Sequence, residues 1–429
     1  MNCIKHISNV TKKKFNTPIV NPKSSSGLSR RSLLKWSGVL TFGIVSKFVS
    51  FARAQQPEIF KKTIGKNSEM IVHNWNPGVL ETPLKLLENY RLTPKQILFV
   101  RNNQIWDGAL SLHHLPLENW NVEMNGLINP STIIQGKKLK QHKQTEIEMV
   151  LQCSGNGRSY YANTFRTSGT QWGKGGMGNL HWKGVPLKNL VSDLKLEINP
   201  LAKFITAEGR DIPPTNTAAD FEHSMPIDDV LDKAILAIEM NGEPIPAVHG
   251  GPVRLIIPGY YGTMNIKWLT RLRFETEESD NYNHIHRYRT FKSKVELGSN
   301  PPRTLENSRP TWRQKINSTV WFPANNQQVK GPNLNLRGVA WNDGSVKLKA
   351  LEISTNQGET WDQVQLDFSS GPFAWHHWNA QLKFLSGKHQ IWVRAVDTTG
   401  QKQPLDGSIN WNPSGYEWNG VTKIDVVVT

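Results

Sequence analysis

The sequence predicts an α+β protein in which a mixed domain, residues 55–305, precedes an all-β domain, residues 306–429. Two observations support this division. After residue 97, short apolar runs alternate with Gly, Pro and Asn turns, which is the pattern of strands joined by tight connections. Over residues 300–313 the chain becomes rich in proline and polar residues, the composition of a linker between domains.

The first domain is expected to contain few helices. Prolines interrupt residues 55–95 and predict an extended lead-in, with one short helix at 79–90. An apolar run at 97–100 predicts a strand. Helical spacing of apolar residues recurs at 186–194 and 227–236, so we expect a helix in each stretch.

Short runs of β-branched and aromatic residues, separated by Gly, Asn and Asp turns, fill the second domain. Their spacing is that of a β-sandwich, and we expect one of the immunoglobulin-like kind. Gly358 lies in the turn of a predicted hairpin, 354–361, where a positive φ favours glycine. The predicted strands are 318–322, 329, 334–341, 346–354, 360–366, 375–382, 389–397 and 421–428.

The first 54 residues contain ten Lys or Arg and no Asp or Glu. Within them Arg30 and Arg31 precede a weakly hydrophobic stretch that includes Lys47 and ends in Ala-Arg-Ala at Ala54. A paired arginine, such a stretch and a small-x-small end predict a twin-arginine export signal, residues 1–54, and a periplasmic mature protein. A membrane anchor is the alternative, but the stretch is short and charged for a bilayer span. We expect no membrane span after cleavage.

Removal of the predicted export signal would lower the net charge of the chain. The formal net charge of +16 includes the ten cations of the predicted signal. Without them, 41 Lys and Arg oppose 35 Asp and Glu, a net charge of about +6. The mature chain has no long basic run and no basic stripe interleaved with aromatic residues. The composition therefore gives no support to nucleic-acid binding.

Cys153 is the only thiol of the predicted mature chain, because Cys3 lies in the export signal, so no internal disulfide can form. It follows the apolar run 149–151 and opens a glycine-rich loop that also contains Arg158 and Trp172. The residues alone leave three interpretations open. Cys153 is a buried inert thiol, a nucleophile activated by a distant partner, or a metal ligand whose other donors come from a cofactor.

The loop contains an ordered set of motifs: LQCSGNGR at 151–158, GTQW at 169–172 and WKGVPL at 182–187. This set resembles the molybdenum-cofactor loop of the sulfite oxidase family, and the resemblance continues in order along nearly all of the mature chain. It implies a sulfite-oxidase-type molybdopterin-binding domain followed by a sandwich domain that forms a homodimer.

The resemblance also assigns roles to side chains. Cys153 is the protein ligand to the metal of a molybdenum-molybdopterin cofactor. Arg101 and Arg158 contact the substrate anion, Trp172 is a wall of the substrate channel, and Tyr288 hydrogen-bonds the metal's oxo ligand. The remaining cofactor contacts implied are Asn102, Asn103, His249, Arg254 and Lys267. His284 and His286 also suggest a metal pair, although two histidines without a third ligand are a weak signal.

The sequence departs from the family pattern at two places. Asn103 replaces a histidine, although an amide can still hydrogen-bond a pterin or a phosphate. Near the final strand, Ser414 and Trp418 occupy the plausible positions of an arginine that many members direct towards the substrate. With one cation fewer, we expect weaker binding of a dianion such as sulfite.

The resemblance implies a periplasmic oxidoreductase that oxidises sulfite to sulfate by oxygen-atom transfer. No C-x-x-C-H haem-attachment motif and no H-P-G-G motif of the fused haem domain is present, so we expect a separate c-type cytochrome to accept the electrons. One alternative keeps the cofactor but changes the substrate to another oxyanion or a sulfoxide. The other is a non-enzymatic, β-rich exported binding protein in which Cys153 is merely buried.

Overall fold

The structure, a computed structural model, describes residues 59–367 and 369–429. The export signal predicted at 1–54 lies outside these residues and stays a prediction. In the described part of the chain, every helix is too short or too polar to cross a membrane.

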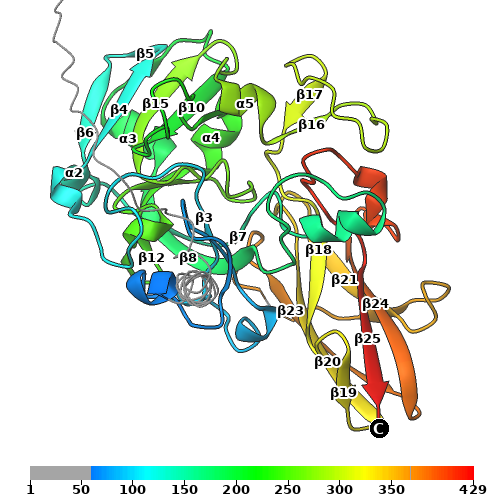
Figure 1. Cartoon of the computed structure of the whole chain (residues 1–429). Coiled ribbons are helices and arrows are strands. Elements are labelled where there is room, and N and C mark those ends of the chain that lie inside the picture. Colours follow the sequence, from blue (N-terminus) through cyan, green and yellow to red (C-terminus); the bar gives the residue numbers. More distant parts are fainter. Residues whose placement is uncertain (1–58, 368) are drawn as a thin grey trace, which may run out of the picture. The chain divides into compact units, whose positions relative to one another are not determined.

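A mixed sheet and an antiparallel sheet form the centre of the N-terminal region (Figure 1). In both, most neighbours are antiparallel, and only β15 and β4 run parallel. The first sheet consists, in spatial order, of β11 (Glu222–Pro226), β10 (Phe204–Gly209), β15 (Leu269–Glu275), β4 (Asn121–Gly126) and β6 (Thr132–Gln135). The second consists of β13 (Glu243–Pro244), β12 (Ile235–Met240), β8 (Met177–Pro186) and β7 (Thr145–Gln152), with β14 (Arg254–Ile256) also paired to β12.

Smaller elements complete this region. A three-stranded sheet contains β1 (Ile71–Asn74), β2 (Val79–Glu81) and β3 (Val100–Arg101), and β5 (Ile128–Asn129) pairs with β9 (Glu197–Ile198). Residues 59–63 are helical, and further α-helices are α2 (Gly136–Leu139), α3 (Leu187–Asp193), α4 (Ile227–Lys233) and α5 (Tyr282–His286). The 3-10 turns are η1 (Leu84–Leu86), η2 (Leu117–Asn119), η3 (Arg158–Asn163), η4 (Ala247–His249) and η5 (Gly407–Asn410).

The predicted helices at 186–194 and 227–236 are confirmed as α3 and α4, each of which begins directly after a proline. The helix predicted at 79–90 is wrong. Its first residues form β2, which pairs with β1 and β3, and Pro83 restricts the chain to extended backbone before the short turn η1. Strand pairing with distant residues therefore overrides the local helical spacing.

The C-terminal region consists of strands. One sheet contains β18 (Asn317–Phe322), β20 (Asn333–Trp341) and β23 (His376–Lys383). The other contains β19 (Gln327–Val329), β25 (Thr422–Val428), β24 (Gly387–Asp397), β21 (Leu348–Ser354) and β22 (Asp362–Val364), and β24 and β25 lie side by side in Figure 1. All eight predicted strands are present, and Gly358 has the expected positive φ of 90°.

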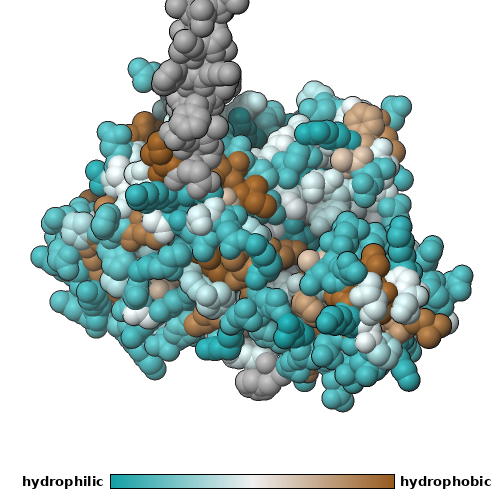
Figure 2. Space-filling view, turned by 60° about the horizontal axis from the view of Figure 1, so that its bottom comes forward, coloured by the Kyte–Doolittle hydropathy of each residue, from teal (hydrophilic) through white to brown (hydrophobic). Residues whose placement is uncertain are grey.

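Apolar side chains from both C-terminal sheets share one buried cluster, to which Leu336 and Ile391 belong. A second cluster joins the sheets and helices of the N-terminal region, with Leu236, Leu272 and Leu190 fully buried. On the surface shown in Figure 2, hydrophilic residues predominate and hydrophobic residues form separated groups. The apolar residues are therefore used mainly for these cores.

The segment 300–313, predicted as a linker, is only partly one. Its last part contains β17 (Ser308–Pro310), which pairs antiparallel with β16 (Arg289–Phe291). Residues 292–307 are therefore the loop of a hairpin, and both ends of this loop are anchored by strand pairing.

Candidate active site

An inner pocket and an outer cleft adjoin in this fold. The inner pocket has a cavity volume of about 60 Å³ and the outer cleft one of about 700 Å³. Four residues line both of them: Arg101, Asn103, Cys153 and Tyr288. The motifs around these residues are far apart in sequence, and the fold brings them to one place.

Cys153 follows the last residue of β7 and lies between the two cavities. Its side chain is a free thiol, the residue is 6% exposed, and its N–H donates to the Gly176 carbonyl at 2.8 Å. Nowhere in 59–367 or 369–429 do three His, Cys, Asp or Glu side chains gather as a metal site. A metal bound by this thiolate would need its other donors from a cofactor.

The glycine loop that follows Cys153 is positioned by a buried carboxylate. Glu81, at the end of β2, accepts the N–H groups of Gly173 at 3.0 Å and Gly175 at 2.9 Å. His73 contacts the same carboxylate at 2.7 Å. The chain passes so close to β2 that a Cβ on Gly175 would lie 1.8 Å from the Thr82 carbonyl oxygen. Only glycine fits there.

Gly175→Ala is therefore expected to lower the free energy of unfolding by at least about 2 kcal/mol, because β2 or the loop must move. Urea denaturation measures this change. Gly371→Ala is the matched control, since a Cβ at Gly371 meets no atom within 4 Å. Equal stability of the two variants would contradict the close packing of the loop on β2.

Tyr288 has a left-handed backbone, with φ of 53°, and its ring stacks on Tyr416 at 5.3 Å. Its hydroxyl lies 2.7 Å from Nδ2 and 2.9 Å from Oδ1 of Asn103, and accepts from Arg101 Nη2 at 3.2 Å. Burial raises the pKa of the Tyr288 hydroxyl, so the phenol stays protonated at neutral pH. Asn103, predicted as a cofactor contact, thus also orients the tyrosine.

Arg158 begins η3, and its guanidinium contacts carbonyl oxygens from two regions. Nε donates to Ser414 O at 2.8 Å and Nη1 to Thr170 O at 2.8 Å. Trp172 also lines the outer cleft, although its side chain is fully buried against His73. Throughout the described residues, neither Arg158 nor Arg101 has a carboxylate within ion-pair distance.

The inner pocket is lined by the buried Arg254 and the half-buried Lys267. Lys267 Nζ donates to Asn102 Oδ1 at 2.7 Å and to the Val248 carbonyl at 2.8 Å, and Arg254 Nη1 donates to the His249 carbonyl at 2.8 Å. Burial lowers the pKa of Arg254 to about 9 and that of Lys267 well below its ordinary value. All four predicted cofactor contacts named here line the same pocket.

The sequence analysis did not identify two further residues near this pocket. Lys66 is buried, with Nζ 2.8 Å from His249 Nε2 and 2.8 Å from the Leu98 carbonyl it donates to. Asp211 lines the pocket, and burial raises the pKa of its carboxyl to about 7. A single lysine in a lead-in segment and a single aspartate before a turn have no local signal that distinguishes them from surface residues.

These side chains fit an anionic cofactor. Burial lowers the pKa of Lys66, Arg254 and Lys267, and none of them is within ion-pair distance of a carboxylate in the described structure. Buried cations of this kind are costly unless an anion compensates them. A bound phosphate would supply that compensation, with Cys153 at the other end of the pocket available to a metal.

The two positions that depart from the family pattern have different environments. Ser414 lines the outer cleft. Trp418 does not, because its indole packs edge-to-face on Tyr161 at 4.8 Å and lies against Gly157. Trp418 therefore supports the loop, and only Ser414 stands where an additional cation could reach a bound anion.

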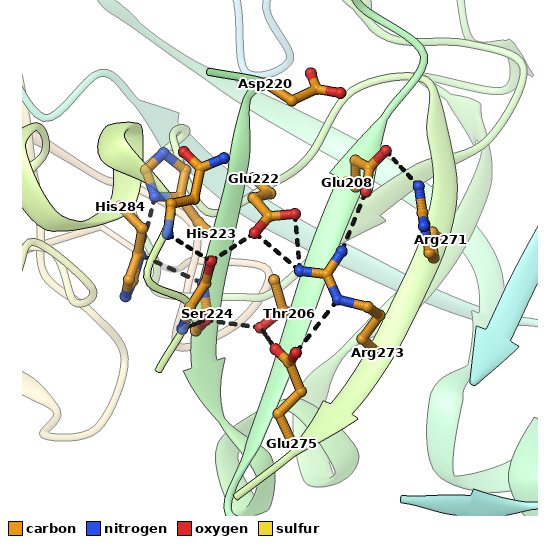
Figure 3. Close-up of polar contacts among 12 residues, drawn as sticks. Thr206, Glu208, Asp220, Glu222, His223, Ser224, Arg271, Arg273, Glu275 and His284 are labelled. Carbon is orange, nitrogen blue, oxygen red and sulfur yellow. Dashed lines mark hydrogen bonds and ion pairs between the residues drawn. The ribbon is translucent and has the colours of Figure 1, made fainter. Parts of the chain in front are cut away.

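Behind Tyr288, the face of β11, β10 and β15 carries a polar network (Figure 3). Arg273 reaches three glutamates there: Glu222 at 2.8 Å, Glu208 at 3.2 Å and Glu275 at 3.3 Å. This network lies outside the two cavities and stabilises the sheet that supports the tyrosine.

The histidine pair at 284 and 286 is separated by the fold. His284 is buried, with Nδ1 3.2 Å from His223 Nδ1 and Nε2 2.8 Å from Glu278, whereas His286 lines the outer cleft. The His223 ring in turn packs edge-to-face on Tyr288 at 5.5 Å. The pair forms no metal site in the described chain, and His284 instead supports the packing behind Tyr288.

Lys174 connects the cofactor loop with the C-terminal region. It is buried, donates to the Ser318 carbonyl at 2.9 Å and contacts the Thr422 hydroxyl at 2.5 Å. Burial lowers the pKa of its ammonium to about 7. Above this pH the folded protein holds the neutral amine while the unfolded chain still binds the proton.

The stability of wild type relative to Lys174→Met is therefore expected to rise with pH from about 7 towards 10, by up to about 1.4 kcal/mol per pH unit, and to be flat below 7. Urea denaturation of both proteins between pH 6 and pH 9.5 measures the difference. Lys233→Met, at a half-buried surface ion pair, is the control and should show no such slope. A pH-independent difference for Lys174 would contradict the lowered pKa.

Two family matches cover much of the described chain, including Cys153, although Arg101 and Tyr288 lie outside the matched ranges. Residues 110–283 match the family described as "Oxidoreductase molybdopterin binding domain", and residues 308–428 match the family described as "Mo-co oxidoreductase dimerisation domain". With a lone buried thiol beside a cation-lined pocket, these matches define the chain as a molybdopterin-binding oxidoreductase, and they imply a molybdenum-molybdopterin cofactor.

Comparison with longer relatives identifies the family within this class of oxidoreductases. Mitochondrial sulfite oxidases of Drosophila melanogaster and Homo sapiens are 29% and 27% identical over 377 and 372 residues, covering 82% and 83% of this chain and 62% and 66% of those proteins. The nitrate reductase (NADH) of Cichorium intybus is 30% identical over 388 residues, covering 82% of this chain and 40% of that protein. The chain belongs to the sulfite oxidase family, and it spans less than two thirds of the length of each of these relatives.

A solved structure shares the fold. The sulfane dehydrogenase SoxCD from Paracoccus pantotrophus has a TM-score of 0.67 and 23% sequence identity, covering 80% of this chain and 83% of that chain. The predicted molybdopterin-domain fold is thus confirmed, together with a strand-rich C-terminal region. Membership of an enzyme family argues against the non-enzymatic binding protein considered from the sequence.

Proposed function

We propose that this protein oxidises sulfite to sulfate by oxygen-atom transfer and passes the electrons to a c-type cytochrome. The observation that supports this most is the position of Arg101 beside Cys153 and Tyr288, with Arg158 in the same cleft and no carboxylate paired to either arginine in the described chain. Two permanent cations without counter-ions favour a small anion. The likeness to mitochondrial sulfite oxidases agrees with this choice.

In the proposed reaction, sulfite and water give sulfate, two protons and two electrons. Each residue of the site has a separate role in it. Arg101 and Arg158 bind the oxygens of sulfite and orient its sulfur towards the inner pocket. Tyr288 keeps its proton because burial raises its pKa, so its hydroxyl can donate a hydrogen bond beside the reacting oxygen. Cys153 would bind the metal, while His249, Arg254, Lys267 and Asn102 would bind the anionic part of the cofactor. When bound, the cofactor supplies the oxygen atom and accepts two electrons.

We also propose the setting in which this reaction takes place. Residues 1–54 act as a twin-arginine signal and bring the folded protein to the periplasm. The C-terminal region is an immunoglobulin-like sandwich that forms a homodimer, which the match of residues 308–428 to a dimerisation domain supports.

A second candidate keeps the cofactor and acts on another oxyanion or a sulfoxide, for example by reducing nitrate. Two observations favour it: the nitrate reductase (NADH) of Cichorium intybus is also similar to this chain, with 30% identity against 29% for the Drosophila sulfite oxidase, and Ser414 stands in the outer cleft where an arginine was expected. A singly charged anion needs fewer cations than sulfite.

Purification from a host that makes molybdenum cofactor, followed by metal analysis and steady-state assays, separates these functions. Molybdenum near one per chain with sulfite-dependent reduction of cytochrome c would support the first proposal. Molybdenum with nitrate turnover by reduced viologen, and none with sulfite, would support the second. A protein without molybdenum would contradict both.

A further inference from the structure

Residues Asn300 to Arg303 form part of the wall of the outer cleft. They belong to the loop of the β16–β17 hairpin, and two prolines, Pro301 and Pro302, stiffen them. Arg303 is 8% exposed, and its guanidinium lies over the Phe291 ring at 5.0 Å. A loop that was predicted as a linker therefore places a buried arginine beside the candidate substrate site.

The contacts of Arg303 are few and polar but not acidic. Nη2 donates to the Ser414 hydroxyl at 2.8 Å, and Nη1 lies 3.4 Å from Asn300 Oδ1. In the part of the chain that the structure describes, its buried Nε has no hydrogen-bond partner and its guanidinium has no carboxylate. Arg303 is thus a buried cation without a counter-ion, which is unfavourable unless an anion binds next to it.

Ser414 joins this cation to the candidate site. Its hydroxyl accepts from Arg303, and its carbonyl accepts from Arg158 Nε at 2.8 Å. Both arginines line the outer cleft together with Arg101. A serine at position 414 is short enough to leave room for the Arg303 side chain, whereas an arginine there would place a second positive charge against it.

We propose that Arg303 is a third anion-binding residue of the outer cleft and that it replaces, from another part of the chain, the cation missing at position 414. This inference rests on the proposed function and deepens it. The exposed Arg287 also lines the cleft, but Arg303 is a buried cation next to Arg158 through Ser414. Added to Arg101 and Arg158, it favours doubly charged oxyanions over singly charged ones, so Arg303 determines specificity for sulfite and for the product sulfate over nitrate.

Arg303→Gln tests the proposal in the full-length holoprotein. The variant should raise both KM for sulfite and the competitive inhibition constant of sulfate by roughly tenfold or more, with kcat within about twofold, since the lost contact is to the bound anion. Inhibition by nitrate should change much less than inhibition by sulfate, an effect that a merely structural role would not produce. Arg303→Lys should restore most of the sulfate affinity.

Lys294→Gln is the matched control. It removes the same charge from the same hairpin loop at an exposed position outside the cleft, and it should leave both constants unchanged. Thermal denaturation of all three variants checks that each is folded.

Titration calorimetry with sulfate keeps this test independent of turnover. If wild type binds sulfate and Arg303→Gln binds it at least tenfold more weakly, the inference stands even where sulfite is not oxidised and the proposed function fails. Equal affinity in the two proteins, or no binding of sulfate to wild type, would overturn the inference. If Arg303→Gln does not fold, wild type that binds nitrate as tightly as sulfate in the same calorimetry would overturn it as well.

Discussion

Replacing Cys153 with serine is expected to reduce molybdenum-dependent turnover by more than about a hundredfold while leaving the protein folded. Loss of a residue that only supports a metal ligand already costs about 10- to 100-fold, and Cys153 is the only thiol in the described chain. The change replaces sulfur by the smaller oxygen at a site that is 6% exposed, so packing changes little. Metal analysis and sulfite-dependent cytochrome c reduction measure the outcome.

A labelling experiment on the same residue distinguishes metal ligation by the Cys153 thiol from simple burial of that thiol. Iodoacetamide should modify the wild-type thiol in cofactor-free protein far faster than in the loaded protein. Cys3→Ser, the same substitution within the predicted export signal, is the control for both assays and should behave as wild type. Wild-type turnover in Cys153→Ser would exclude a ligand role and restore the interpretation of an inert thiol.

Lys267→Met is expected to have opposite effects on stability and on cofactor retention. Burial lowers the pKa of Lys267 well below its ordinary value, so in the cofactor-free fold this lysine costs free energy, either as a poorly solvated ammonium or through release of its proton. Methionine removes that charge at similar volume, and cofactor-free Lys267→Met should be at least as stable as wild type. The loaded variant should lose its cofactor at least about tenfold faster, because the anion loses a buried cation.

Urea denaturation of cofactor-free protein and molybdenum content after dialysis measure these two effects. The pH dependence of the free energy of unfolding gives a second test, because the lowered pKa fixes the direction of the change. A lysine with a lowered pKa makes cofactor-free wild type more stable as pH rises towards 10.5, and this gain should be smaller in the variant. Lys174→Met, which removes a more deeply buried lysine outside the inner pocket, should share the stability effect but keep the cofactor. Unchanged retention in Lys267→Met would remove Lys267 from the cofactor site.

Much of the candidate site could be predicted from the sequence, because its residues lie in local patterns. The apolar run before Cys153 is confirmed as the end of β7, and the run 253–257 contains the buried strand β14. Arg101 and Tyr288, which are 187 positions apart, come within 3.2 Å of each other, as expected if both serve one site. Their catalytic roles stay predictions until the assays above are made.

The parts that could not be predicted depend on contacts between distant segments. Residues 79–81 were expected in a short helix, yet they pair with two strands whose positions only the folded chain defines. Lys66 and Arg303 are single cations in segments without periodicity, and their importance appears only when they are buried beside His249 and Ser414. The sequence pattern shows that a cation is missing at position 414, but no local pattern distinguishes Arg303 from other arginines.

The outer cleft is composed of residues from both regions of the chain. Ser414 and Tyr416 come from the segment before β25, and they contact Arg158 and Tyr288 from the molybdopterin-binding region. Lys174 adds a buried connection to Ser318. A chimera that joins this N-terminal region to the C-terminal region of a relative would therefore carry a mismatched substrate site even if each half folded correctly. The two halves must be exchanged as a pair, and changes of specificity in this lineage are expected to require coordinated substitutions on both sides of the cleft.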